Sequence, residues 1–147
     1  MALLLFRLAV PVYYEPTVAI LTTASVYNNT VNMTNTGSSY IRPAFLVNTT
    51  FNGDITVNST SGSGIYFSEN AGGSATLASG RTISVGGTGF TAGELRLQRF
   101  TQFGTTAQNL VLTGVAAVRV GPSSTCYGSV AVTSPSLFLD GATFIIT

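Results

Sequence analysis

Short pairs of apolar residues, each pair separated by one other residue, recur along this sequence at a nearly constant spacing. The pairs follow residues that favour turns, and an apolar residue at every second position is typical of a short β-strand with one buried face. The first series is spaced by 24, 28, 27 and 20 residues, and its members are Val31/Met33, Ile55/Val57, Ile83/Val85, Leu110/Leu112 and Val130/Val132. This recurrence predicts a repeat architecture.

A second series of apolar pairs interleaves with the first and follows it by 13, 10, 12, 8 and 7 residues. Its members are Ala44/Leu46, Ile65/Phe67, Leu95/Leu97, Val118/Val120 and Leu137/Leu139. A third and weaker series consists of Ala75/Leu77, Phe100 with Phe103, and Phe144 with Ile145. Three series would give the repeating unit a triangular cross-section.

Strand series that advance together indicate a β-solenoid, in which each turn of the chain lays a strand on the equivalent strand of the turn before. We therefore expect an all-β chain forming a parallel β-helix of about five rungs, each of roughly 25 residues. Inward aliphatic residues would form stacked columns, and glycines in stretches such as NGD and VGGTG would turn the corners. The alternative is an antiparallel β-sandwich, which also has short alternating strands but no reason to repeat turn and strand together.

Residues 1–24 differ from the rest of the sequence, and we assign residues 25–147 to the solenoid domain. The stretch MALLLFRLAVPVYYEP matches a signal peptide poorly, because Arg7 interrupts its apolar run and Pro11 follows soon after. We expect an atypical terminal segment that caps the domain, with a degraded signal as the alternative. A membrane-spanning helix needs about 20 consecutive apolar residues, and the apolar run of this segment is shorter than that.

The composition removes several classes of function. Charged residues make up only 7% of the chain, and the net charge is +1. The six basic residues, all arginine, form no cluster, so we expect no nucleic-acid partner. The absence of histidine and lysine removes the usual general base, the commonest metal ligand and any Schiff-base lysine. We expect no cofactor and no metal site.

Cys126 is the single cysteine, so the chain can form no internal disulfide. The stretch TFNGDITVNST at residues 50–60 resembles TCYGSVAVTSP at residues 125–135, and in this comparison Cys126 matches Phe51. A thiol in an apolar column is expected to be buried and unreactive.

The stretches TFNGDITVNSTSGSGIYF, GGSATLASGRTISVGG and GTTAQNLVLTGVAAVRV are similar to the repeats of large secreted β-helix proteins of bacterial surfaces, especially filamentous adhesin-like proteins. The resemblance covers about residues 48–144. It implies a right-handed parallel β-helix that serves as a stalk or binding rod and carries no catalytic residues.

One outward face of the predicted solenoid is the candidate binding surface. Tyr66, Arg96, Arg119 and Phe138 lie at equivalent outward positions of the second series. Arginines stacked on neighbouring strands repel each other unless a carboxylate or a bound anion lies between them. Glu94 is the candidate carboxylate, and an acidic sugar or a carboxylate of a partner is the alternative. The aromatic residues could stack on sugar rings or pack in a protein interface.

Other motifs are better explained by structure than by chemistry. The glycine run VGGTGFTAGE, residues 85–94, lacks the lysine and the following helix of a phosphate loop, so we expect a wide corner. It also resembles the start of a calcium-binding nonapeptide repeat, but Thr91 stands where the essential Asp would lie. Asp54 and Asp140 adjoin glycines and are expected to hydrogen-bond backbone groups in turns.

The sequence thus favours a non-enzymatic structural or adhesive module of a cell-surface or extracellular protein. We expect it to stack end to end or to belong to a larger assembly, with neighbouring protein subunits or a glycan as partners. A viral tail-spike or capsid-decorating protein, located on the virion, is one alternative. A β-helix polysaccharide lyase or hydrolase is the other, although such enzymes need several converging carboxylates.

Overall fold

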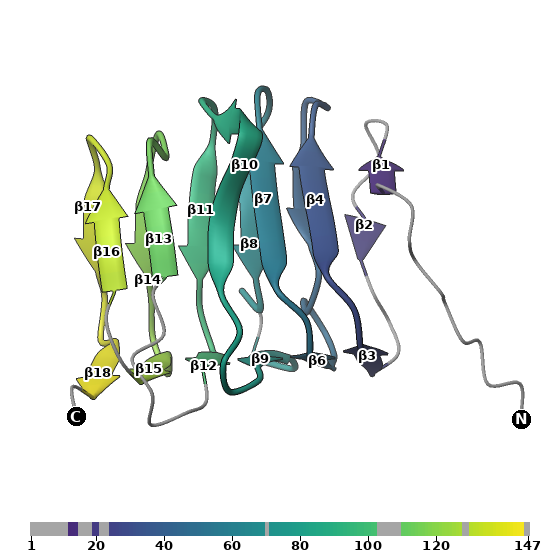
Figure 1. The fold of residues 1–147 in the computed structure, drawn as a ribbon, viewed down its shortest axis with the longest axis vertical. Helices are drawn as coiled ribbons and strands as arrows, with labels where there is room; N and C mark the ends of the chain where they lie inside the picture. The colour runs from purple at the N-terminus through teal and green to yellow at the C-terminus, as the bar shows by residue number, and fades with distance from the viewer. Residues whose placement is uncertain are drawn as a thin grey trace, which may run out of the picture.

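The structure is a computed structural model of the chain, and it describes residues 12–14, 19–20, 24–69, 71–102, 110–127 and 130–145. Within these residues the chain forms eighteen short strands and no helix (Figure 1). The strands form three six-stranded sheets. The protein is therefore an all-β structure, as the alternating apolar pattern predicts.

Each sheet takes every third strand of the chain. The first sheet contains β1 (Val12–Tyr14), β4 (Val31–Asn35), β7 (Ile55–Ser59), β10 (Ile83–Phe90), β13 (Leu110–Thr113) and β16 (Val130–Thr133). The second contains β2 (Ala19–Ile20), β5 (Tyr40–Arg42), β8 (Gly64–Phe67), β11 (Glu94–Leu97), β14 (Val118–Val120) and β17 (Leu137–Leu139). The third contains β3 (Ser25–Tyr27), β6 (Asn48–Phe51), β9 (Ser74–Leu77), β12 (Phe100–Gln102), β15 (Thr125–Tyr127) and β18 (Thr143–Ile145).

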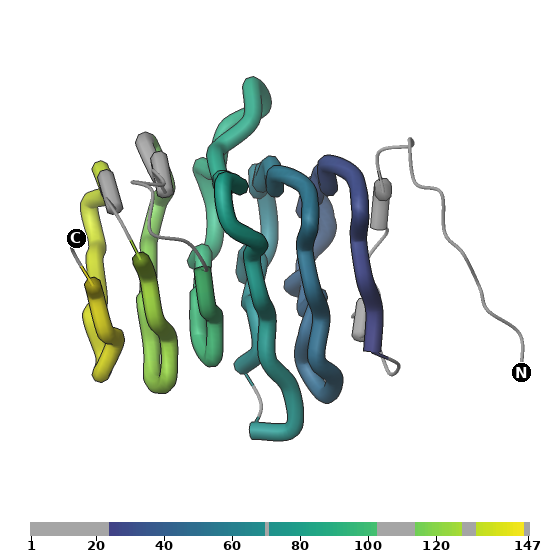
Figure 2. The backbone as a smooth tube through the Cα atoms, turned by 60° about the horizontal axis from the view of Figure 1, so that its bottom comes forward, coloured from purple at the N-terminus to yellow at the C-terminus, as the bar shows by residue number. Residues whose placement is uncertain are grey.

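Every pair of neighbouring strands in these sheets is parallel, and each strand from β1 to β15 pairs with the strand three places further along the chain. Figure 2 shows the corresponding path, in which successive segments of the chain lie side by side along the molecule. This connectivity is compatible with a β-helix. It does not fit the antiparallel β-sandwich, whose neighbouring strands run in opposite directions.

The strand register confirms the first apolar series. Val31 pairs with Ile55, and Ile83 pairs with the same Ile55 from the other side. Further along the sheet, Leu110 pairs with Val130. The first sheet has six strands, one more than the five expected, because β1 comes from the segment that we set apart as residues 1–24.

The second series is also confirmed, except for its first pair. Ile65, Leu95, Val118 and Leu137 follow one another in register, but the strand before them is β5, in which Ile41 pairs with Ile65. The prediction of Ala44/Leu46 was therefore wrong. Pro43 directly follows β5 and has no backbone N–H to donate to a sheet, which explains why the strand ends before it. Ala44 is buried in the turn that follows, and Leu46 is 45% exposed.

The third series forms the third sheet, with changes at Phe103 and at Ile145, which pairs with Tyr127 while Phe144 pairs with the core residue Cys126. Phe100 pairs with Ala75 as expected, but Gln102 pairs with Leu77 and Cys126, so it holds the core position predicted for Phe103. Phe103 itself lies outside the described residues.

In the segment 1–24, β1 and β2 pair with β4 and β5. Its roles as a cap or a degraded signal stay predictions.

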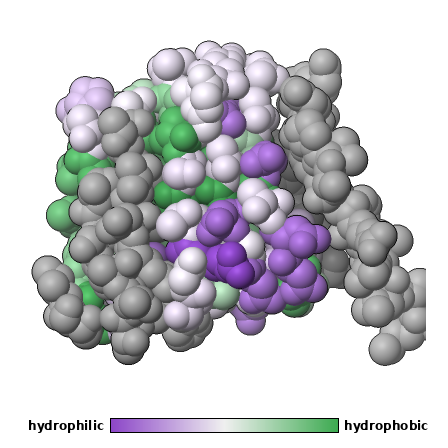
Figure 3. All heavy atoms as spheres, in the orientation of Figure 1, coloured by the Kyte–Doolittle hydropathy of each residue, from purple (hydrophilic) through white to green (hydrophobic). Residues whose placement is uncertain are grey.

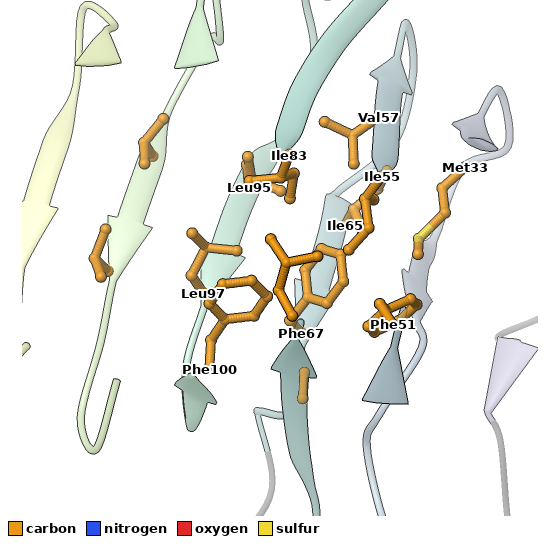
Figure 4. Close-up of a cluster of buried hydrophobic side chains, with 14 of the residues drawn as sticks. Met33, Phe51, Ile55, Val57, Ile65, Phe67, Ile83, Leu95, Leu97 and Phe100 are labelled. Atoms are coloured by element: carbon orange, nitrogen blue, oxygen red, sulfur yellow. The ribbon is translucent and has the colours of Figure 1, made fainter. Parts of the chain in front are cut away.

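The core lies between the three sheets and is built from stacked columns of apolar side chains (Figure 4). Phe51, Phe67 and Phe100 run through it as an edge-to-face chain, with ring centroids 5.8 and 5.6 Å apart. All three rings are fully buried. Such pairs add about 0.5–1.5 kcal/mol each beyond the burial of their area, so the aromatic chain helps to hold the second and third sheets together.

Buried polar side chains satisfy the backbone at the corners. The Asn35 amide donates hydrogen bonds to the carbonyl oxygens of Ser39 and Gly64. The Ser124 hydroxyl donates to the carbonyl oxygen of Leu97 and accepts a hydrogen bond from the Phe100 N–H. Because unpaired buried polar groups are costly, these bonds let the chain turn sharply between sheets without losing stability.

Candidate binding surface

The outer face of the second sheet carries the predicted surface residues in one column. Arg96 in β11 pairs in register with Tyr66 in β8 on one side and with Arg119 in β14 on the other. Arg119 in turn pairs with Phe138 in β17. The structure therefore brings these four predicted residues together on neighbouring strands.

Glu94, the first residue of β11, places its carboxylate between the two stacked arginines. Arg96 donates to Glu94 Oε2 from Nη2 at 2.6 Å and from Nε at 3.1 Å. Arg119 Nε donates to the other oxygen, Oε1, at 2.8 Å. The sequence left open whether Glu94 or an external anion lies between the two arginines, and in the structure it is Glu94.

The ion pairs continue in both directions along the sheet. Glu69 lies just after β8, and its carboxylate bridges Arg96 Nη1 at 2.5 Å and Arg42 Nη2 at 2.7 Å. The contact with Arg42 is an ion pair without hydrogen-bond geometry. At the other end, Arg119 also pairs with Asp140. We call these six residues the ion-pair ladder, in the order Arg42, Glu69, Arg96, Glu94, Arg119 and Asp140.

Aromatic rings pack against the arginines of the ladder. The guanidinium carbon of Arg96 lies 4.1 Å from the centre of the Tyr66 ring, and that of Arg119 lies 4.4 Å from the centre of the Phe138 ring. The guanidinium of Arg42 lies between Tyr40 at 3.8 Å and Phe45 at 4.3 Å. These geometries are cation–π contacts. The Tyr66 ring also stacks on Tyr40 at 5.3 Å, so other residues of the chain cover it.

Burial and charge together shift two pKa values on this surface. Partial burial raises the pKa of Tyr66 above its ordinary value, and this effect outweighs the lowering effect of the nearby Arg96 charge. Burial lowers the pKa of Arg119, but its hydrogen bonds to Glu94 and Asp140 outweigh burial and raise the pKa. Neither shift moves a group toward neutral pH, where a general acid or base would titrate.

The charged groups of the ladder neutralise one another. Three carboxylates face three guanidinium groups, and the Arg96 and Glu94 side chains are only 20% and 14% exposed. The most exposed groups of this surface are Phe138, which is 43% exposed, and Asp140, whose side chain is 48% exposed. The ion pairs and the cation–π contacts thus connect neighbouring strands of the second sheet.

The two aspartates next to glycines differ in their roles. Asp54 accepts a hydrogen bond from the Thr82 N–H at 2.9 Å, so it binds backbone as predicted, but in the neighbouring rung instead of in its own turn. Asp140 was expected to stabilise its turn, and its observed side-chain partner is Arg119.

Sequence reasoning missed half of the ladder. Arg42 was not placed in the column because the Ala44/Leu46 pair was given its rung. Glu69 follows β8 at a corner, and no sequence periodicity indicates that its side chain turns back over the sheet. The alternating stretch YIR, directly before a proline, was the signal that could have located Arg42.

The glycine run lies within and after β10, and among the described residues no helix follows it. The pairing of β10 with β7 shifts register between Val85 and Phe90, which is a β-bulge. Residues 85–90 of the run therefore lie in a bulged strand and not in the wide corner that was expected, and only residues 91–93 form the turn before β11.

Comparison of the chain with protein-family models, with curated proteins and with solved structures finds no match. In the described ranges, no group of three or more Cys, Asp or Glu residues could hold a metal ion. The same ranges contain no helix that is long and apolar enough to cross a membrane. The interpretation of the surface therefore depends on its own geometry.

Proposed function

We propose that this chain is a non-enzymatic structural or adhesive module of a cell-surface or extracellular protein, built as a right-handed parallel β-helix. The regular pairing of each strand with the third strand further along supports this, because such pairing makes a rod of stacked rungs. The resemblance of residues 48–144 to filamentous adhesin-like repeats points the same way.

The ion-pair ladder is the observation that carries the proposal. It joins β5, β8, β11 and β14, and it ties Asp140 beyond β17 to them. A polysaccharide-cleaving site would instead need carboxylates free to reach a substrate. Among the described residues, the three carboxylates of the ladder are each paired with arginine, and the fourth carboxylate, that of Asp54, accepts a hydrogen bond from the Thr82 N–H.

The competing enzymatic role is tested by incubating the purified chain with polygalacturonate, alginate and hyaluronate. New reducing ends and unsaturated products would be measured over time. We expect no turnover by the natural chain. Turnover that disappears in a Glu94→Gln or an Asp54→Asn variant would overturn the proposal in favour of a lyase or hydrolase.

The adhesive part of the proposal is tested by surface plasmon resonance on the same polysaccharides, immobilised. Binding that is lost in a Phe138→Ala variant would locate the contact on the candidate surface. Absence of binding to every glycan would leave the chain a structural module only. A lateral threefold assembly, measured by light scattering, would instead favour the viral alternative.

A further inference from the structure

One column of threonines runs along the outer face of the third sheet. In register, Thr50 pairs with Thr76, Thr76 with Thr101, Thr101 with Thr125, and Thr125 with Thr143. The same residue thus holds the same position on five successive strands, and we call these five residues the threonine column. The corresponding column of the second sheet changes between tyrosine, arginine and phenylalanine. The preference of strands for β-branched side chains therefore does not by itself explain a single residue throughout.

The side chains of the threonine column face away from the core, and their hydroxyl groups are open. Thr76, for example, lies between the fully buried Ala75 and Leu77, so it points to the other face of the sheet. Among the described residues, none of the five hydroxyl groups hydrogen-bonds to another residue, whereas the Thr49 hydroxyl donates to the Pro43 carbonyl oxygen. The column is therefore a row of hydroxyl groups available to a ligand.

The face around the column carries little charge. The four described carboxylates are engaged elsewhere, three in the ion-pair ladder over the second sheet and that of Asp54 with the Thr82 N–H. Arg99, at the corner two residues before Thr101, is the described charged residue nearest to the column in sequence. Figure 1 places the third sheet along the lower side of the molecule, and Figure 3, in the same orientation, shows hydrophilic residues gathered on its lower part. A ligand of this face therefore meets mainly neutral polar groups.

The face is too small to hold a protein partner stably. Six strands about 4.8 Å apart, each with three residues at a rise of about 3.3 Å, cover roughly 300 Å². A stable protein–protein interface buries about 800 Å² on each partner. The ligand that suits the column is therefore one whose own structure repeats at the spacing of the strands, so that every threonine makes the same contact.

The spacing of the column is close to a spacing in ice. Hydroxyl groups in equivalent rotamers on neighbouring strands repeat at about 4.8 Å. Water molecules in ice form tetrahedral hydrogen bonds of about 2.75 Å, which places second neighbours about 4.5 Å apart. A lattice water can therefore lie between two successive hydroxyl groups and bond to both. Threonine is stiff at χ1 and water in ice is already immobilised, so the contact orders few groups that were mobile before.

We propose that the threonine column is an ice-binding face. The five hydroxyl groups hydrogen-bond to water of the ice lattice, and the threonine methyl groups pack between these waters. A chain held on the surface of an ice crystal slows the growth of the crystal at that point. This activity goes beyond the proposed structural role and does not use the ion-pair ladder.

Slow freezing of a solution of the full chain tests the proposal. We expect the natural chain to enter the ice, and we expect Thr101→Lys to lower the ratio of protein in ice to protein in liquid by about tenfold, because a long side chain holds the lattice away. Thr56→Lys is the matched control, since Thr56 is also half-buried but lies on β7 in the first sheet. Circular dichroism would confirm that both variants are folded. A natural chain that stays in the liquid, or an equal loss in Thr56→Lys, would overturn the inference.

A milder variant keeps the test valid if lysine disturbs the sheet. Replacing both Thr76 and Thr101 by alanine removes two central hydroxyl and methyl groups without adding bulk. The folded double variant should enter ice less than the natural chain, and its solutions should show faster ice growth in a nanolitre osmometer. Unchanged uptake and growth in this variant would show that the column is not the contact and would overturn the inference.

A crystalline polysaccharide is the other repeating surface that hydroxyl groups could contact. Sedimentation of the chain with microcrystalline cellulose and with chitin tests it. Binding that Thr101→Lys abolishes, together with no uptake into ice, would assign the face to such a polysaccharide and overturn the inference. Ice uptake and polysaccharide turnover are separate measurements, so absence of ice uptake leaves the structural role in place, and turnover removes that role whether or not the chain binds ice.

Discussion

Cys126 is fully buried in the core column that contains Leu77 and Gln102. Burial raises the pKa of its thiol to about 11. Since the folded state favours the neutral thiol, its contribution to stability is full below the ordinary pKa and is lost as the pH rises toward 11. At pH 8 we expect an aromatic disulfide reagent to label the native chain slowly and the denatured chain rapidly. Rapid labelling of the folded chain would contradict the buried position.

Phe67 occupies the centre of the edge-to-face chain between Phe51 and Phe100. Replacing it with alanine removes both ring contacts and leaves a cavity, so Phe67→Ala should lower the free energy of unfolding by about 3–5 kcal/mol. Phe67→Leu keeps much of the volume and should cost clearly less. Denaturant titration of both variants measures this difference, and equal costs would show that the lost ring contacts, and not the lost volume, account for the destabilisation.

Glu94 joins the neighbouring strands β11 and β14 of the second sheet, because its carboxylate binds both Arg96 and Arg119. A Glu94→Gln variant keeps the shape but leaves Arg96 and Arg119 stacked without the charge between them, so we expect a loss of about 1–2 kcal/mol in unfolding free energy. Asp140→Asn is the control, because that side chain is 48% exposed and pairs with one arginine, and it should cost less than about 1 kcal/mol. High salt should narrow the gap between Glu94→Gln and the natural chain, since it screens the repulsion.

Strand positions were predictable wherever inward apolar residues alternate, because a one-residue slip would turn a whole column of such residues outward. This is why the registers from Ile65 to Leu137 agree with the sequence pattern. Gln102 could not be foreseen, since a polar residue at an inward position breaks the only signal used. Glu69 and Asp140 lie beyond strand ends, where side-chain direction depends on corner geometry instead of period.

Stability across the whole molecule should follow the distance from its ends, because each rung of a repeat structure is held chiefly by its neighbours. β8 and β11 lie between further strands on both sides and have fully buried inward residues, whereas all three residues of β17 are exposed. In hydrogen exchange at low protein concentration, we therefore expect amides of β8 and β11 to exchange through global unfolding. Amides of β17 and β18 should exchange through local opening at lower free energy. Uniform protection along the chain would instead mean that the rungs unfold as one cooperative unit.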